Sequence, residues 1–332
     1  MVSIFRSYHP AVIFLLLFYV ALFRIPLFVS AISFVPPVSS NYLSALTYNF
    51  LDLLIGNRNY LYHILASLLV FLQALYFNYI INRHRILSKN SYLPAMAYVL
   101  LSSLLTEFTL LTPALLANTF LLFSVAKILS IYKKERAAAS IFDAGLLISI
   151  ASLFFFPYLA FFVFILMSMI LLRPFNLREY AMAILGVIIP YYFIGVYFFW
   201  HHELPAFWKT LQITHLNFPV QQIEKSTRVI VIGGSLLLVI LWTLFYLQAN
   251  MFRVVVQVRS YLTIFMLLFI AGILSMLVEF NGEFFHFVWM ALPVGLAFAI
   301  FFMEVRRRWF AEILHFFLLL SVLFFQFYFL IK

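Results

Sequence analysis

Long apolar runs, separated by short basic stretches, are the feature that most constrains the fold of this 332-residue chain. The basic stretches include RHRILSK, KKER, RPFNLRE and EVRRR, and between them lie pairs of runs rich in Leu, Phe, Ile and Val. A helix of ~20 residues, rising 1.5 Å per residue, crosses the ~30 Å hydrocarbon core of a bilayer. The pattern therefore predicts a chain that crosses a membrane many times.

The composition excludes a soluble globular protein. Hydrophobic residues make up 66% of the chain, charged residues only 10%, and the mean hydropathy is +1.09. A soluble domain carries roughly 25% charged residues, because polar groups must cover its surface. A membrane β-barrel would need ~10-residue segments of alternating polarity, whereas these runs are apolar on all sides. We therefore predict an all-α, polytopic transmembrane helical bundle that forms one integral membrane domain over residues 1–332.

Eleven membrane spans are expected from the apolar runs. They fall at roughly 11–32, 60–82, 92–109, 113–131, 139–155, 157–172, 181–200, 229–249, 260–278, 285–303 and 309–331. The hairpins at Thr112-Pro113 and Phe156-Pro157 are so short that the helices on either side of each are expected to be antiparallel neighbours. With 43 Phe and 19 Tyr against nine Gly, the helices are expected to meet through bulky side chains and not through small-residue seams.

The positions of the basic residues predict the orientation in the membrane. With the N-terminus in the cytoplasm and the C-terminus outside, the cytoplasmic segments hold fifteen basic residues: Arg6, Arg83, Arg85, Lys89, Lys127, Lys133, Lys134, Arg136, Arg173, Arg178, Arg253, Arg259, Arg306, Arg307 and Arg308. The outer segments hold five: Arg58, Lys209, Lys225, Arg228 and Lys332. Cytoplasmic loops of membrane proteins are enriched in Lys and Arg, so this asymmetry favours the orientation. It also explains the formal charge of +10 without nucleic-acid binding, which we do not expect.

The longer outer loops are 33–59 and 201–228. Pro36 and Pro37 end the first span, and an amphipathic segment from Tyr42 to Ile55 is expected to form a short interfacial helix. A second amphipathic helix is expected around Trp208, followed by four C-terminal spans over 229–332. The chain contains no Cys and no nucleotide-binding or nucleophile-elbow motif, which argues against thiol chemistry, Cys-ligated metals and an ATP-driven pump.

Most acids and histidines fall on the predicted outer face, and Asp52 is the leading candidate for chemistry. It lies between Phe50-Leu51 and Leu53-Leu54, and apolar surroundings of this kind raise the pKa of a carboxyl and suit general acid/base work. The alternative is that Asp52 belongs to the polar face of an interfacial helix.

Two further groups are candidates for binding. A divalent cation could be bound by His201, His202 and Glu203 together with Glu279, Glu283 and His286, although these residues lack the helical spacing of a metal motif. Anionic lipid phosphate could be bound by Arg58 and Arg228 with Lys225. Arg24 interrupts the first span in ALFRIPLF, where it either needs an anionic partner or extends to the interface.

The pattern of elements over residues 1–200 resembles the membrane module of the GT-C class of polyprenyl-phosphate-sugar glycosyltransferases. In that class a first span leads into an outer loop with interfacial helices, here 33–59, and hairpins with Pro-led helices follow, here Leu110–Pro174. The chain is also similar to uncharacterised Phe-rich integral membrane proteins of Bacteroidota. The GT-C resemblance implies that Asp52 is the catalytic acid, although it lies later in the loop than the class usually places it. It further implies that Glu107 or Asn118 is a second acid or amide, and that Arg24, Arg58 or Arg228 binds the lipid phosphate.

Three functions remain open from the sequence. The resemblance favours a glycosyltransferase, or a degenerate relative, that uses polyprenyl-linked sugar at the outer leaflet of the bacterial inner membrane. The alternative is a non-catalytic membrane subunit that scaffolds a cell-envelope complex with other membrane proteins. A transporter is the third; it should carry charged or broken-helix features at mid-membrane, and Pro190 and Gly233-Gly234 are the candidates for these.

Overall fold

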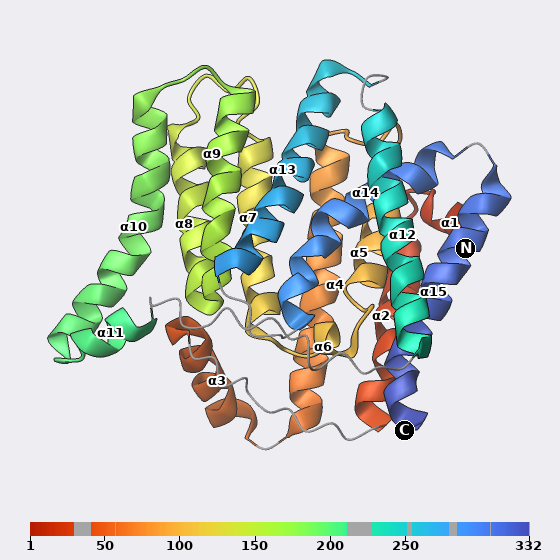
Figure 1. Cartoon of the computed structure of the whole chain (residues 1–332), viewed down its shortest axis with the longest axis horizontal. Helices are drawn as coiled ribbons and strands as arrows, with labels where there is room; N and C mark the ends of the chain where they lie inside the picture. Colours follow the sequence, from red (N-terminus) through yellow and green to blue (C-terminus); the bar gives the residue numbers. More distant parts are fainter. Residues whose placement is uncertain are drawn as a thin grey trace.

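The computed structural model describes residues 1–29, 41–56, 58–210, 227–250, 254–278, 284–305 and 307–331, and within these ranges all regular structure is helical (Figure 1). The helices are α1 (Val2–Phe5), α2 (Val12–Val29), α3 (Tyr42–Ile55), α4 (Asn59–Arg83), α5 (Leu93–Leu101), α6 (Thr106–Thr109), α7 (Pro113–Leu129), α8 (Ala138–Phe154), the 3₁₀ helix η1 (Phe156–Ala160), α9 (Phe161–Leu172), α10 (Leu177–Trp200), α11 (Leu204–Thr210), α12 (Thr227–Asn250), α13 (Val256–Val278), the 3₁₀ helix η3 (Phe284–Met290), α14 (Ala291–Glu304) and α15 (Arg308–Ile331). The predicted all-α class is confirmed for this part of the chain.

Six helical segments of the described residues are long and apolar enough to cross a membrane. They are Val12–Val29, Asn59–Arg83, Leu177–Trp200, Val256–Val278, Phe284–Glu304 and Arg308–Phe327. Shorter apolar helices cover Tyr42–Ile55, Pro113–Leu129, Ala138–Phe154 and Phe156–Leu172. The chain is therefore a multi-pass membrane protein by the length and composition of its helices, and the number of eleven spans stays a prediction.

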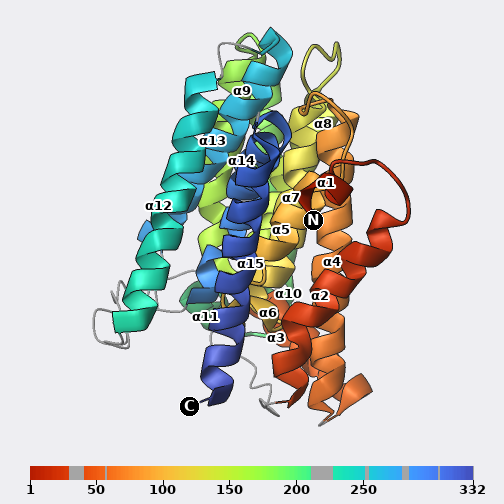
Figure 2. The same ribbon diagram turned by 90° about the vertical axis from the view of Figure 1, so that its right-hand side faces the viewer.

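The bundle has two parts that differ in how their helices meet (Figures 1 and 2). The hairpin half consists of α7, α8, η1, α9 and α10, which follow one another along the chain and pack on their neighbours. The terminal half consists of α2, α4, α5, α14 and α15, and it brings the beginning of the chain against its end. Helix α13 contacts both halves through α9 and α14.

A small-residue seam joins α8 to α10 in the hairpin half, contrary to the expectation of bulky interfaces throughout. A Cβ atom placed on Gly145 would lie 2.5 Å from the carbonyl oxygen of Ala183, and one on Gly186 would lie 2.4 Å from the carbonyl oxygen of Phe142. The Ser149 hydroxyl donates to the Val187 carbonyl at 2.8 Å across the same contact. Small residues let helix backbones approach closely, which is a common way for helices to associate in lipid.

The predicted span at 92–109 is wrong as a continuous helix. Helix α5 ends at Leu101, residues 102–105 form turns, and α6 covers only Thr106–Thr109. At 1.5 Å per residue the nine residues of α5 extend about 13.5 Å, less than half of the hydrocarbon core. All nine are buried, so this short helix lies inside the bundle.

Of the two hairpins led by Pro, only the second brings its flanking helices together as predicted. At the first, the Thr112 hydroxyl caps α7 by accepting from the Leu115 N–H at 3.2 Å, and Pro113 occupies the first turn as predicted. However, α5 packs mainly on α4 and α14 and meets α7 through the hydrogen bond from Asn118 to Tyr98, so the predicted pairing of 92–109 with 113–131 as antiparallel neighbours is wrong. The break and α6 separate the two helices. At the second hairpin, α8 does pack on η1 and α9, as predicted.

Basic links gather at one end of the bundle. The links between α4 and α5, α7 and α8, and α9 and α10 lie towards the same end, whereas α3, α6 and α11 lie towards the other (Figures 1 and 2). The Arg173 guanidinium ties two of these links together, because it pairs with Glu179 at 2.9 Å and donates to the Lys134 carbonyl. The segregation of charge predicted from the sequence is therefore a feature of the folded chain, at least in the links that the structure describes.

Candidate functional site

Helix α3 forms over the residues predicted for it, Tyr42–Ile55, and two hydrogen bonds attach it to the end of the bundle. The Asn41 amide donates to the Phe154 carbonyl at the end of α8, at 3.2 Å. The Tyr48 hydroxyl donates to the Leu111 carbonyl, at 2.9 Å, in the link before α7. Burial raises the pKa of Tyr48, so its hydroxyl stays protonated and keeps donating at neutral pH. The helix is thus held by its buried side while its other side stays accessible.

Asp52 lies one turn after Tyr48 on α3, with an exposed side chain. Its neighbours Leu53 and Leu54 are also exposed, at 84% and 66%, so the apolar enclosure expected around the carboxyl does not form in this structure. The Asp52 carboxylate acts electrostatically on the hydroxyl of Tyr62 in α4. The described part of the chain has three ion pairs, Met1–Glu312, Lys127–Asp143 and Arg173–Glu179, and Asp52 belongs to none of them.

The residues predicted to act together with Asp52, namely Glu107, Arg58 and Arg228, lie on three different elements. Glu107 is half-buried on α6, which packs on η3 and α4. Arg58 is exposed at the residue before α4. Arg228 lies in the first turn of α12, and the position of its side chain falls outside what the structure describes, as does that of Lys225.

The candidate cation ligands are not assembled among the described residues. His201, His202 and Glu203 are exposed just after α10, and the His201 ring lies on Tyr197. His286 is buried on η3, where its Nε2 lies 2.9 Å from the Ser275 hydroxyl. Glu279 and Glu283 lie outside the described residues. No group of three His, Asp or Glu side chains able to bind a metal occurs in the described ranges.

Arg24 is the charged residue that the structure places most unusually. It lies in α2 with no exposed surface, and its Nε, Nη1 and Nη2 atoms have no hydrogen-bond partner. It takes part in none of the three ion pairs, and the titratable group acting on it is the hydroxyl of Tyr98 on α5. Of the two alternatives expected for this residue, extension to the interface is wrong, because the whole side chain is enclosed.

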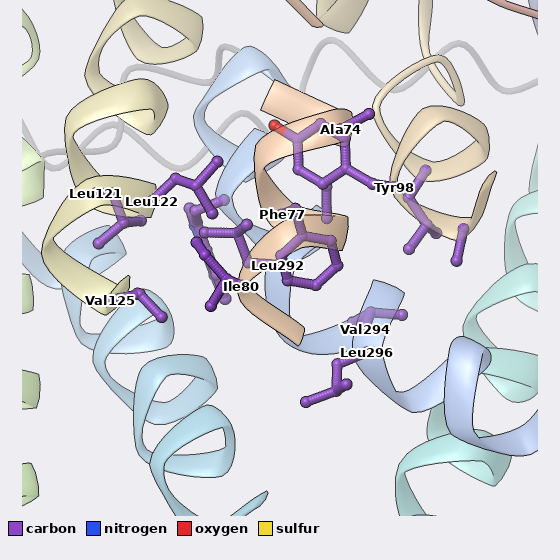
Figure 3. Close-up of a cluster of buried hydrophobic side chains, with 14 of the residues drawn as sticks. Ala74, Phe77, Ile80, Tyr98, Leu121, Leu122, Val125, Leu292, Val294 and Leu296 are labelled. Carbon is purple, nitrogen blue, oxygen red and sulfur yellow. The ribbon is translucent and has the colours of Figure 1, made fainter. Parts of the chain in front are cut away.

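Tyr98 is the centre of a polar network that links α4, α5 and α7. Its hydroxyl donates to Gln73 Oε1 at 2.6 Å and accepts from Asn118 Nδ2 at 2.9 Å. Gln73 Nε2 in turn donates to the Thr119 hydroxyl at 2.7 Å. Figure 3 shows Tyr98 extending towards α4, where it lies beside Ala74 and Phe77 at the edge of the apolar core. Buried amides in membrane bundles are costly unless they are paired, so this network fixes α4, α5 and α7 relative to one another.

The break after α5 was missed from the sequence, together with the polar groups around it. Ser102 and Ser103 are fully buried in the turn, and Gln326 of α15 donates to the Ser103 carbonyl at 2.7 Å. The segment LSSLLTEF contains neither Pro nor Gly and reads as apolar, so hydropathy continues the span through it. The amide side chains of Gln73 and Gln326 lie inside apolar runs, and they are the sequence feature that could have indicated polar groups inside the bundle.

Two cavities near these elements are too small for a sugar. One lies between α5, α14 and α15 with an apolar lining that includes Ala97, Leu101 and Phe298. The other lies beneath α3 and includes Tyr42, Ser152 and Tyr191 among its lining residues. Each holds about 10 Å³, the space of one water molecule, whereas small-molecule pockets measure roughly 300–1,000 Å³.

No protein-family model, curated protein or solved structure matches this chain. What the fold and the site define is thus a class: a multi-pass, all-α membrane protein with an acid on an exposed end helix and an enclosed arginine in its interior.

Proposed function

We propose that this protein crosses a bacterial inner membrane eleven times, with the broken segment α5–α6 as one of the crossings, and that its N-terminus is in the cytoplasm and its C-terminus outside. The gathering of basic links at one end of the bundle supports this orientation, since cytoplasmic loops retain Lys and Arg. The opposite end, with α3, α6 and α11, then faces the outer leaflet.

At that leaflet the leading function is that of a GT-C-like glycosyltransferase, or a degenerate relative, acting on polyprenyl-phosphate-linked sugar. The observation that carries it is α3, an end helix attached through Tyr48 that leaves Asp52 accessible to an acceptor. Asp52 would accept the proton of the acceptor hydroxyl as its oxygen bonds to the anomeric carbon of the sugar. The bond from that carbon to the phosphate oxygen would break through an oxocarbenium-like transition state, and polyprenyl phosphate would leave. Glu107 is the second acid of the proposal.

Complementation of a deletion strain tests this function. Asp52→Asn should abolish complementation and change the envelope glycan profile, because it removes the base while keeping the side-chain shape. The matched control is Asp143→Asn, which alters an acid paired with Lys127 at the other end and should leave the glycan profile unchanged. Full complementation by Asp52→Asn at normal protein levels would rule the transferase out.

A non-catalytic membrane subunit is the second candidate, favoured by the position of α10. This helix packs on α8, α9 and α11 and leaves Tyr192, Phe193 and Phe199 at least 63% exposed. Only 17% of its apolar window is buried, against 44% or more in the other candidate spans. A partner's membrane helices would cover this face. Stable co-purification with an envelope protein, lost on Phe193→Ala but retained with Asp52→Asn, would favour this function over the transferase.

A further inference from the structure

The end of α4, the α7–α8 link and the start of α13 all lie towards the basic end of the bundle (Figures 1 and 2). They meet on Tyr261, which is buried in the first turns of α13. The ring of Tyr261 contacts the His84 ring, just after α4, at 5.3 Å between centroids and the Tyr132 ring, in the α7–α8 link, at 5.7 Å. Gln257 Nε2 donates to the Tyr261 hydroxyl at 3.0 Å. His84, Tyr132 and Tyr261 therefore form an aromatic floor that joins three elements.

Three exposed cations border the aromatic floor. Arg83 and Arg85 lie on either side of His84 in the chain, and the Arg83 charge acts on the His84 ring. Lys133 follows Tyr132, and its Nζ atom lies 5.6 Å from the centre of the Tyr132 ring. None of the three cations belongs to an ion pair in the described part of the chain. Their charges are therefore available to an anion from outside the protein.

The surrounding segments contain few acids to balance this charge. Over 83–92, 130–137 and 254–261 the one acid is Glu135, and the basic residues are Arg83, Arg85, Lys89, Lys133, Lys134, Arg136 and Arg259. Two acids of neighbouring helices are paired elsewhere, Asp143 with Lys127 at 2.7 Å and Glu179 with Arg173 at 2.9 Å. A surface with this imbalance carries a positive potential, which favours an anionic ligand.

Two of the bordering cations have a backbone conformation that favours glycine. The φ angle is 51° at Arg85 and 53° at Lys133. At the end of α4 the Arg85 N–H donates to the Asn82 carbonyl and the Ile86 N–H to the Ile81 carbonyl, both at 3.1 Å, an arrangement in which Gly usually occupies the left-handed position. Left-handed residues other than Gly are disfavoured, and they concentrate at functional sites. The chain thus keeps a cation at two positions where Gly would be more stable.

The aromatic floor lies at the height of lipid head groups. Arg83 is the last residue of α4, and Tyr261 is about 7.5 Å along α13 from its start, so both are at the ends of candidate spans. The Arg83 guanidinium donates to the Tyr79 hydroxyl at 2.8 Å, and the Tyr79 ring, 50% exposed, stacks on Tyr76 one turn deeper. An aromatic surface therefore continues from the cations along the side of α4, where an acyl chain can lie.

We propose that Arg83, Arg85 and Lys133, with the aromatic floor, bind the phosphate of an anionic phospholipid head group. Guanidinium groups match two phosphate oxygens, and basic surfaces between spans on the cytoplasmic side recognise anionic lipids. The three cations are exposed, so a head group reaches them without rearrangement of the helices. The choice of leaflet rests on the orientation proposed above, whereas binding itself requires neither that orientation nor chemistry at Asp52, so the two proposals can fail separately.

Lipid-induced stabilisation of the purified full chain tests this site. In detergent without phospholipid, the melting temperature is measured against phosphatidylglycerol, phosphatidylcholine of the same acyl chains, and inorganic phosphate. We expect a saturable rise with phosphatidylglycerol and none with the other two. Arg85→Gly and Lys133→Gly should each weaken binding of phosphatidylglycerol about tenfold, the loss of one charge-assisted contact. Both variants should melt higher than the wild type without lipid, because Gly suits the left-handed conformation, so weaker binding cannot come from a loss of folding.

The matched control is Arg178→Gln, which removes one exposed positive charge from the first turn of α10, a helix that packs on α8, α9 and α11. This variant should bind phosphatidylglycerol like the wild type. Equal weakening by Arg178→Gln would show general attraction to the basic end and overturn the proposal, as would unchanged binding by both glycine variants. Stabilisation by inorganic phosphate or by poly-glutamate, without any by phosphatidylglycerol, assigns the surface to a free anion or an acidic protein and overturns it as well.

Discussion

The hairpin half and the terminal half differ in how many of their buried polar groups have hydrogen-bond partners. In the hairpin half, Ser149 and Ser152 use their hydroxyls to join α8 to α10, and Gly145 and Gly186 let the two backbones touch. In the terminal half, the three guanidinium nitrogens of Arg24 and several amide atoms, among them Asn78 Oδ1 and Gln326 Oε1, are buried without partners, whereas the described part of the hairpin half leaves Ser168 Oγ and Asn118 Oδ1. Buried polar groups are costly when they lack partners, so the terminal half keeps its buried charge at a higher cost in stability than the serine contacts of the hairpin half.

The largest expected effect lies in the seam of the hairpin half. Gly186→Ala places a methyl group within 2.4 Å of the Phe142 carbonyl oxygen and 2.9 Å of the Leu146 nitrogen, so α8 and α10 must separate. We expect a loss of about 3 kcal/mol in unfolding free energy, measured by SDS titration in mixed micelles. The control is Gly234→Ala in α12, where nothing lies within 4 Å and helix propensity should add roughly 0.5–1 kcal/mol. Equal effects at the two glycines would show that the seam is not closely packed.

Replacing an arginine should change the unfolding free energy in opposite directions in the two halves. Arg24→Met should stabilise the chain by about 2 kcal/mol, since it replaces an unpaired buried charge with an apolar side chain. Arg173→Met should destabilise it by about 2 kcal/mol, because Glu179 and the Lys134 carbonyl lose their donor. Destabilisation by Arg24→Met would mean that protein groups already satisfy the guanidinium, and the contrast between the halves would disappear.

Loss of the Tyr98 hydroxyl should cost more than loss of a comparable hydroxyl in the hairpin half. Tyr98→Phe leaves Gln73 Oε1 and Asn118 Nδ2 unsatisfied in the core and should lower the unfolding free energy by about 2 kcal/mol. Tyr158→Phe removes one bond to the Ala114 carbonyl, at 3.2 Å, and should cost about 1 kcal/mol. Thermal unfolding of both variants in the same detergent compares them, and a larger effect at Tyr158 would contradict the central role of Tyr98.

The smallest effect concerns pH at the basic end. Burial lowers the pKa of His84, and the nearby Arg83 lowers it further. Well above pH 6.5, His84 is neutral in both the folded and the unfolded chain, so its protonation does not reduce the stability of the folded state. As the pH falls below 6.5 the unfolded chain binds the proton first, so the folded state loses stability until the pH passes the lowered pKa. The pH dependence of the melting temperature between 5 and 7 should therefore be shallower in His84→Gln, and an unchanged slope would contradict the shift.

The helices that lipid dictates were predictable from the sequence. Pro113 and the capping Thr112 begin α7 where expected, and Tyr42–Ile55 forms α3, because local propensity and hydropathy determine these segments. Contacts between distant segments were not predictable. Gly145 and Gly186 meet although 41 positions separate them, and neither helix carries a signal that names its partner.

The candidate site was predictable only as residue types. Arg24 and Asp52 stand out in the sequence as charges beside apolar runs, yet the exposure of Asp52 and the enclosure of Arg24 depend on packing. The break after Leu101 escaped prediction because tertiary contacts, above all the Gln326 bond to the Ser103 carbonyl, compensate the lost helix there. That bond joins residues 223 positions apart, beyond any local pattern.

This long-range bond also has a consequence for biosynthesis. Helices α7 to α10 can pack as soon as each follows its neighbour into the membrane, whereas α2, which carries Arg24, packs on α15, the last described helix. Since the N-terminal part is inserted first, α2 must wait with a charged side chain in the bilayer until synthesis of the chain is nearly complete. A chain that stalls before α15 would therefore expose an unsatisfied arginine to lipid, a mark by which membrane quality control could recognise an unfinished protein.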